Sequence, residues 1–397
     1  MKGRTNNTGR TLFYRLRAAR LSYVLLPALA AGTLFLALSC DLFTSKDPFP
    51  PEYYTANFIS AYGFNAFLPS AEVPEPFDPA APVVTRRWDI DYRYTGWDAP
   101  HRYDYLTLEA TGGTVSDIGS PIFPGLPADA PVYRLEIVNL VTDADFEIDA
   151  GGDWTPSGGA AFQRVDVSPL GGAWSMRLSA PSSSRIDYET RVRPGFTLLE
   201  GGAYRYRYRI LPDLPTRIIT GDNTQEATNP GAGTPFVRIT GQFSQNDTGI
   251  LSLRFEPAED SFGAVYFDDL RLTRQGGMSL VLRLRPVETW PHMEQGVYSF
   301  SVWVHSDPTV ASAGEPYSID TFVLTMRPVA PASFAVTSAR YQPAAGWQFL
   351  SSSMTGKAIQ FDGAFAPVIE LTLDFNESLP GRVLLAHPVL QFHPDGL

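Results

Sequence analysis

The chain has 397 residues, of which 13% are aromatic and only 18% are charged, and its formal charge is −11. This charge argues against a nucleic-acid partner, because phosphate backbones are bound by clustered Lys and Arg and the chain has only three lysines: Lys2, Lys46 and Lys357. The length allows two or three domains, and 33 glycines with 34 prolines are typical of a β-rich protein with many turns.

The first forty residues have the pattern of a lipoprotein signal. Six Lys and Arg residues precede an apolar stretch at 21–38, which is followed by Ser39 and by Cys40, the only cysteine. A basic segment, an apolar segment and a small residue are the parts of a secretory signal, and a lone cysteine at this place indicates lipidation and not a disulfide. We predict a signal peptide at 1–39, lipidation of Cys40 and a location in the bacterial cell envelope, anchored to a membrane.

An uncleaved anchor is the alternative, because the 18 residues of 21–38 are just long enough to span a bilayer. A strict lipoprotein signal has Leu where this chain has Ala37, and Asp41 after the cysteine leaves the choice of inner or outer membrane open. Cleavage leaves 25 basic and 42 acidic residues, a formal charge of −17. Residues 40–52 contain Pro48, Pro50 and Pro51 and are expected to form an extended tether.

The rest of the chain is expected to be all-β. Short runs of β-branched and aromatic residues, several of them alternating with polar ones, are separated by Gly and Pro, as in antiparallel sandwiches. The expected strands are 87–94, 103–110, 132–141, 174–180, 203–211, 236–243, 250–255 and 264–272. Residues 212–235, rich in Thr, Asn and Gly, are expected to form a loop.

An internal repeat divides the part after residue 131. Residues 199–208 align without gaps on residues 293–302, and shorter matches lie upstream and downstream. Such a repeat predicts two related sandwiches in tandem, at 131–275 and 276–397. The β-rich region at 53–130 is left with two alternatives: it completes the second sandwich or forms a small domain of its own.

Three motifs of the first copy resemble a known group of proteins. They are residues 139–147, the Leu-x-Gly-Gly-x-Tyr turn and strand at 199–204, and the strand at 265–272 with its Asp pair. In order and spacing they resemble bacterial carbohydrate-binding modules of families 4, 9 and 22. That resemblance implies tandem galactose-binding-like jelly rolls that bind polysaccharide or another glycan without catalysis. The second copy departs from the pattern, since it lacks the Phe-Glu start and the Asp pair.

The resemblance also implies a structural calcium ion in the first sandwich. The matching residues here are Glu147 and Asp269, with Asp268 beside it, and carboxylate oxygens are the ligands that Ca²⁺ prefers. On a regular strand Asp268 and Asp269 would point to opposite faces, so at most one of them is expected to bind through its side chain. The alternative is that both are solvated acids at a strand end.

Strand parity predicts where a glycan would bind. Tyr204, Tyr206 and Tyr208 form the apolar face, so the residues between them point outward. Sugar recognition needs an aromatic face and polar groups for the hydroxyls, and the predicted ligand-binding residues are therefore Arg205, Arg207, Trp303 and Trp154. For Trp154 the alternative is core packing, and for the arginines a solvated face.

An enzyme is not expected. The five histidines form no close metal-binding spacing, and the chain has no Gly-x-Ser-x-Gly elbow or phosphate-binding glycine loop. A structural or adhesive surface lipoprotein, whose sandwiches bind protein partners, is the alternative to a glycan-binding one.

Overall fold

The computed structural model describes part of the chain between residues 57 and 394. The described residues are 57–59, 64, 88–92, 105–121, 123–142, 146, 154–156, 161–166, 173–179, 186–191, 202–231, 236–244, 250–258, 263–275, 278–284, 296–307, 311–312, 315–329, 335–355, 360–361, 364–365 and 368–394. The chain divides into two compact units, Met1–Tyr53 and Tyr54–Leu397, and every described residue lies in the second. Cys40 and Glu147 lie outside the described residues. Among those described, no helix has the length and hydrophobicity needed to cross a bilayer.

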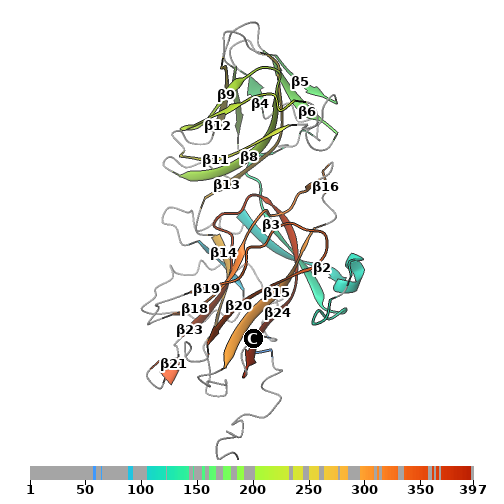
Figure 1. The fold of residues 1–397 in the computed structure, drawn as a ribbon, viewed down its shortest axis with the longest axis vertical. Coiled ribbons are helices and arrows are strands. Elements are labelled where there is room, and N and C mark those ends of the chain that lie inside the picture. The colour runs from blue at the N-terminus through green and yellow to red at the C-terminus, as the bar shows by residue number, and fades with distance from the viewer. Residues whose placement is uncertain are drawn as a thin grey trace, which may run out of the picture. The chain divides into compact units, whose positions relative to one another are not determined.

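The prediction of an all-β fold is confirmed, and the strands form antiparallel sheets (Figure 1). One sandwich, here called the central sandwich, is built from β4 to β13. Its first sheet has the order β10 (Asn223–Ala227), β9 (Thr216–Thr220), β12 (Ile250–Pro257), β7 (Ile186–Arg191), β4 (Trp154–Pro156). Its second sheet has the order β11 (Val237–Ser244), β8 (Ala203–Pro212), β13 (Val265–Arg274), β6 (Ser175–Ser179), β5 (Ala161–Val165).

The other sandwich is called the split sandwich, because its strands come from both sides of the central one in sequence. One sheet has the order β1 (Asp89–Tyr92), β14 (Met278–Leu284), β23 (Val368–Asp374), β18 (Val323–Val329), β19 (Val336–Thr337). The second has the order β2 (Leu106–Thr114), β3 (Pro131–Ile137), β24 (Gly381–His393), β15 (Val297–Ser306), β20 (Gln348–Thr355). The short pairs β16 (Ala311–Ser312) with β17 (Glu315–Pro316) and β21 (Gln360–Phe361) with β22 (Ala364–Phe365) complete the described strands.

The strand pairing answers the question left open for residues 53–130. β1 pairs with β14, while β2 pairs with β3, which in turn pairs with β24. The region therefore supplies strands to the split sandwich. The strand expected to open the first copy is β3, so the boundary expected at residue 131 does not coincide with a boundary between sheets. The physical reason is that a strand joins the sheet whose edge offers it backbone partners, and sequence order does not fix that edge.

The expected loop at 212–235 also differs from the structure. It contains the hairpin of β9 and β10, whose register pairs Thr220 with Asn223. Gly221 in the turn has a φ of 58°, a backbone conformation that favours glycine. The β-branched residues of Thr216–Thr220 favour a strand, and this signal was hidden by the Asn and Gly residues around it.

The core of each sandwich forms where the apolar faces of its two sheets meet. Tyr204, Tyr206 and Tyr208 of β8 are each at most 1% exposed and belong to the hydrophobic core, which confirms their predicted inward direction. Across the central sandwich, the rings of Phe255 on β12 and Phe267 on β13 have centroids 6.0 Å apart. In the split sandwich Trp88 stacks on Phe300 of β15 at 6.0 Å.

The predicted repeat is confirmed by the strand register, and it includes a bulge. β8 pairs with β13 through Asp268↔Arg209 and Arg271↔Arg207, and the register shifts between these two pairs. In the split sandwich β15 pairs with β24, and the corresponding shift lies beside Trp303. At the bulges Asp269 has a φ of 49° and His387 a φ of 50°. Both sandwiches thus share an irregular backbone feature as well as regular strands.

Candidate functional site

A cluster of charged side chains covers the outward face of β8 and β13 in the central sandwich. The carboxylate of Asp269 lies 3.2 Å from Nε of Arg209, 3.1 Å from Nε of Arg271 and 3.5 Å from an Nη atom of Arg207. Asp269 is 5% exposed, while Arg209 and Arg271 are 1% exposed. One buried carboxylate is thus shared by three guanidinium groups.

The bulge explains why Asp269 reaches this face. Phe267 and Leu270 both lie in the core, so two residues, Asp268 and Asp269, stand between consecutive inward positions. The expectation that these two carboxylates lie on opposite faces assumed a regular strand and does not hold here. A regular strand alternates strictly, but the extra residue of a bulge redirects the side chains around it.

The arginines make Asp269 unsuited to calcium. Both of its carboxylate oxygens already accept contacts from guanidinium groups, and a bound Ca²⁺ would lie beside three positive charges. Asp268 is buried, and its Oδ1 accepts a 2.7 Å hydrogen bond from the backbone N–H of Asp269. Within the described part of the chain no group of three or more His, Cys, Asp or Glu residues is arranged to hold a metal ion. A calcium site stays a prediction that depends on Glu147 and Asp268.

The guanidinium group of Arg207 has an incomplete set of hydrogen-bond partners. It is 9% exposed, its only hydrogen bond to Asp269 is long at 3.5 Å, and its buried Nε has no hydrogen-bond partner. Burial lowers the pKa of Arg207 to about 10, and the positive charge of Arg271 adds to this effect. Its guanidinium therefore lies in surroundings that do not fully compensate its charge.

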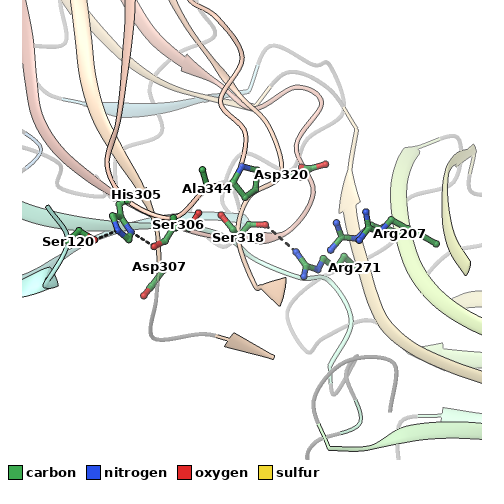
Figure 2. Close-up of a pocket in the computed structure, with 13 residues that line it drawn as sticks. Ser120, Arg207, Arg271, His305, Ser306, Asp307, Ser318, Asp320 and Ala344 are labelled. Atoms are coloured by element: carbon green, nitrogen blue, oxygen red, sulfur yellow. Dashed lines mark hydrogen bonds between the residues drawn. The ribbon is translucent and has the colours of Figure 1, made fainter. Parts of the chain in front are cut away.

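Arg207 lines a pocket of about 700 Å³ together with Arg238 and Arg271. These three residues come from β8, β11 and β13 of the central sandwich. The other lining residues belong to the split sandwich and are Ser120, His305, Ser306, Asp307, Ser318, Asp320, Pro343, Ala344, Ala345 and Gly346. Figure 2 shows Arg207 and Arg271 reaching from their strands towards Ser318 and Asp320. The pocket is thus framed by guanidinium groups on one side and by hydroxyl and carboxylate groups on the other.

Arg271 holds the two sides of the pocket together. One of its Nη atoms donates to the backbone carbonyl oxygens of Ser318 at 3.2 Å and Pro380 at 3.4 Å. Its guanidinium also lies 4.7 Å from the ring centroid of Tyr317. Arg271 therefore satisfies carbonyl groups of the split sandwich while it neutralises Asp269 in the central one.

The split-sandwich side of the pocket is ordered by its own hydrogen bonds. His305 Nε2 lies 2.6 Å from Oγ of Ser120, and Nδ1 donates to the carbonyl oxygen of Ser306. Asp307 is paired with Arg134 at 2.7 Å, and Oδ1 of Asp320 accepts the backbone N–H of Leu379 at 2.7 Å. These contacts hold the polar groups in place before any ligand binds, which lowers the entropic cost of binding.

The predicted ligand-binding residues do not gather at one place. Arg207 lines the pocket, whereas Arg205 is half-buried on the same strand and is not among the lining residues. Trp154 lies in β4, which pairs with β7 in the other sheet of the central sandwich. Of the predicted glycan contacts whose side chains the structure describes, Arg205, Arg207 and Trp303, Arg207 is the one that lines the pocket.

The side chain of Trp303 is packed among apolar residues. It is 7% exposed and packs in a small apolar cluster on the outward face of its sheet, with Val132, Leu384 and Trp347 among its neighbours. The segment around the 3₁₀-helix η4 (Val115–Ile118) contributes to the same cluster. Strand parity placed Trp303 outward correctly, but it could not show that a distant segment covers that face.

Two pocket residues of the central sandwich were missed in the sequence, although a signal was present. Arg271 and Arg238 alternate with core residues on their strands, as Arg207 does on β8. Applying strand parity to β11 and β13 would have placed both on the outward face. On the split-sandwich side the same parity places His305 on the outward face of β15. Most other lining residues of that side come from strand ends and loops far apart in sequence, where parity gives no signal.

Parts of the chain are similar to several solved structures at low sequence identity. No protein-family model matches the chain. No curated protein matches it either. Among solved structures, an arabinose-bound α-L-arabinofuranosidase is similar with 13% identity and a TM-score of 0.29, over 35% of this chain and 26% of that protein.

Carbohydrate-binding modules are also among the similar structures. The N-terminal CBM22-1-CBM22-2 tandem domain from Paenibacillus barcinonensis matches with 10% identity and a TM-score of 0.29, over 63% of this chain and 98% of that one. A family 4 module matches with 13% identity and a TM-score of 0.24, over 34% of this chain and 99% of that one.

Proposed function

We propose that this chain is a lipid-anchored protein of the bacterial cell envelope that binds carbohydrate without catalysis, and that the pocket between its two sandwiches is the binding site. The observation that carries the proposal is the pocket itself. Its volume of about 700 Å³ is that of a small-molecule site. Its hydroxyl, carboxylate and guanidinium groups converge on one space, and such groups bind the hydroxyls of a sugar. The motif resemblance to carbohydrate-binding modules supports the same ligand class.

The test is a glycan array probed with the full chain in detergent, with and without calcium. Binding to a defined set of glycans, lost in Ser306→Trp, would support the proposal, because this substitution places a large ring at a lining position. Phe349→Ala, on the outward face of β20 and outside the pocket lining, is the control and should bind normally. Loss of binding after chelation would support the calcium prediction, and no binding to any glycan by a folded chain would refute carbohydrate binding.

The lipid anchor needs a separate experiment. We expect the chain to incorporate radiolabelled palmitate in bacterial cells and to partition into the membrane fraction. Cys40→Ser should incorporate no label. If Cys40→Ser stays in the membrane with its N-terminal residues uncleaved, the apolar segment at 21–38 is the anchor and lipidation is refuted.

A second candidate function is adhesion through protein contacts, and one observation favours it. Phe123 and Phe349 are 40% and 55% exposed, and both rings lie against Trp303, at 5.8 and 5.1 Å between centroids. Large exposed apolar groups that lie together mark interaction surfaces. A folded chain that binds no glycan but loses attachment to cells in the double variant Phe123→Ser, Phe349→Ser would support this function.

A further inference from the structure

The charge of the pocket differs from that of the whole chain. The protein has 42 acidic and 31 basic residues, yet among the described residues that line the pocket arginines outnumber aspartates. The arginines are Arg207, Arg238 and Arg271, and the aspartates are Asp307 and Asp320. Asp307 is already paired with Arg134, and Arg271 is paired with Asp269, which is not a lining residue. A site with a surplus of guanidinium groups in an acidic protein favours an anionic ligand.

The guanidinium group of Arg207 has a buried N–H donor that makes no hydrogen bond. Arg207 is 9% exposed and lines the pocket, and its Nε has no hydrogen-bond partner. A buried donor without a partner costs free energy that a ligand acceptor recovers on binding. The planar guanidinium fork is matched best by a carboxylate, which accepts two parallel hydrogen bonds. Burial, which lowers the pKa of Arg207, would be offset by a negative charge at this place.

Resting on the proposed function, we propose that the pocket selects acidic saccharides, with the carboxylate of a uronic acid residue bound by Arg207 and Arg238. Arg238 is exposed on β11 and faces the same pocket, so it can contact the carboxylate from the solvent side. The hydroxyl and carboxylate groups of Ser306, Ser318 and Asp320 lie across the pocket from the arginines and suit the sugar hydroxyls (Figure 2).

Trigalacturonate and its fully methyl-esterified form are a matched pair of probes, because they differ in the charge of the carboxyl groups. Titration calorimetry of the full chain should show binding of trigalacturonate, with at least roughly tenfold weaker binding of the ester, as expected when a hydrogen bond to a charged group is lost. Arg238→Gln should weaken binding of trigalacturonate by roughly tenfold and leave binding of the ester unchanged. Arg207→Lys should weaken it similarly, because lysine keeps the charge and lacks the fork.

Arg217→Gln is the control variant. Arg217 lies on β9 in the other sheet of the central sandwich, is 45% exposed at its side chain and pairs with Glu226, so its removal should leave trigalacturonate binding unchanged. The assigned site would be overturned if Arg238→Gln bound trigalacturonate with full affinity. It would also be overturned if Arg217→Gln weakened this binding as much as Arg238→Gln does. Equal binding of acid and ester would overturn the selectivity and leave carbohydrate binding intact. Binding of neutral glycans only would also overturn the inference. If a folded chain binds no glycan at all, the proposed function itself is overturned.

Discussion

The outward faces of the two sandwiches share a bulge at the same place and differ in their side chains. In the central sandwich the positions around the bulge are Arg207, Arg209 and Asp269, and in the split sandwich the equivalent positions are Ser301, Trp303 and His387. The two bulges have nearly the same positive φ, 49° and 50°. The backbone feature therefore does not determine whether the face becomes charged or apolar.

The two copies of the repeat use this outward position in different ways. In the split sandwich Trp303 is covered by the segment around η4 and stabilises the packing of that segment on the sheet. In the central sandwich no equivalent aromatic ring occupies the position, and Arg209 pairs with Asp269 there instead. An apolar face that is covered contributes stability, whereas the charged face of the central sandwich contributes Arg207 and Arg271 to the lining of a pocket.

The largest effect is expected for Trp303→Ala, which tests the apolar half of this comparison. Deleting a buried Trp side chain removes its packing and leaves a cavity, so the free energy of unfolding should fall by about 3 to 5 kcal/mol. Urea denaturation measures it. A variant with unchanged stability and lost glycan binding would contradict the structural role and restore Trp303 as a glycan contact.

Asp269→Asn tests the charged half. Arg207, Arg209 and Arg271 would lose their shared negative charge, and unfolding free energy should fall by about 3 kcal/mol because buried charges are left uncompensated. His387→Asn at the matched bulge position should change it by less than about 1 kcal/mol, since Asn tolerates a positive φ. Both values come from the same urea denaturation series. Equal effects at the two positions would show that the bulge, and not the ion cluster, carries the stability.

Gly296→Ala tests the start of the repeated strand. An added Cβ at Gly296 would lie 1.9 Å from Cζ of Phe392, so the ring must move. We expect a loss of about 1 to 3 kcal/mol, the usual cost of overpacking a core, and a lower melting temperature in calorimetry. The double variant Gly296→Ala, Phe392→Leu should recover part of the loss. No recovery would mean that the backbone at this turn, and not the contact with Phe392, requires glycine.

The smallest effect is expected at an exposed ion pair of the split sandwich. Arg340 donates to Glu377, and this hydrogen bond lowers the pKa of the Glu377 carboxyl group. A lowered folded-state pKa stabilises the protein at neutral pH, and the contribution is lost as the pH falls through that pKa. Arg340→Gln should therefore cost less than about 1 kcal/mol at pH 7, and the difference should vanish in acid. A difference that grows in acid would refute this assignment.

Regular features could be predicted from local patterns. The inward direction of Tyr204, Tyr206 and Tyr208 follows from a side-chain period of two, which holds wherever a strand is regular. The equivalence of β8 with β15 follows from the gapless repeat, and the register confirms it. Asp269 was misplaced because the bulge adds one residue, and no local pattern in the sequence marks where that residue is inserted.

Local patterns in the chain predict the all-β class, the two related sandwiches, the parity of β8 and the side chains on its outward face. They do not predict that β3 pairs with β24, that Trp303 is covered, or that Arg207, Arg238 and Arg271 line a pocket with His305 and Asp320. The two sets of features depend on contacts at different separations along the sequence. Alternation acts between neighbouring residues, whereas strand pairing, coverage of a face and pocket formation depend on contacts between residues tens to hundreds of positions apart.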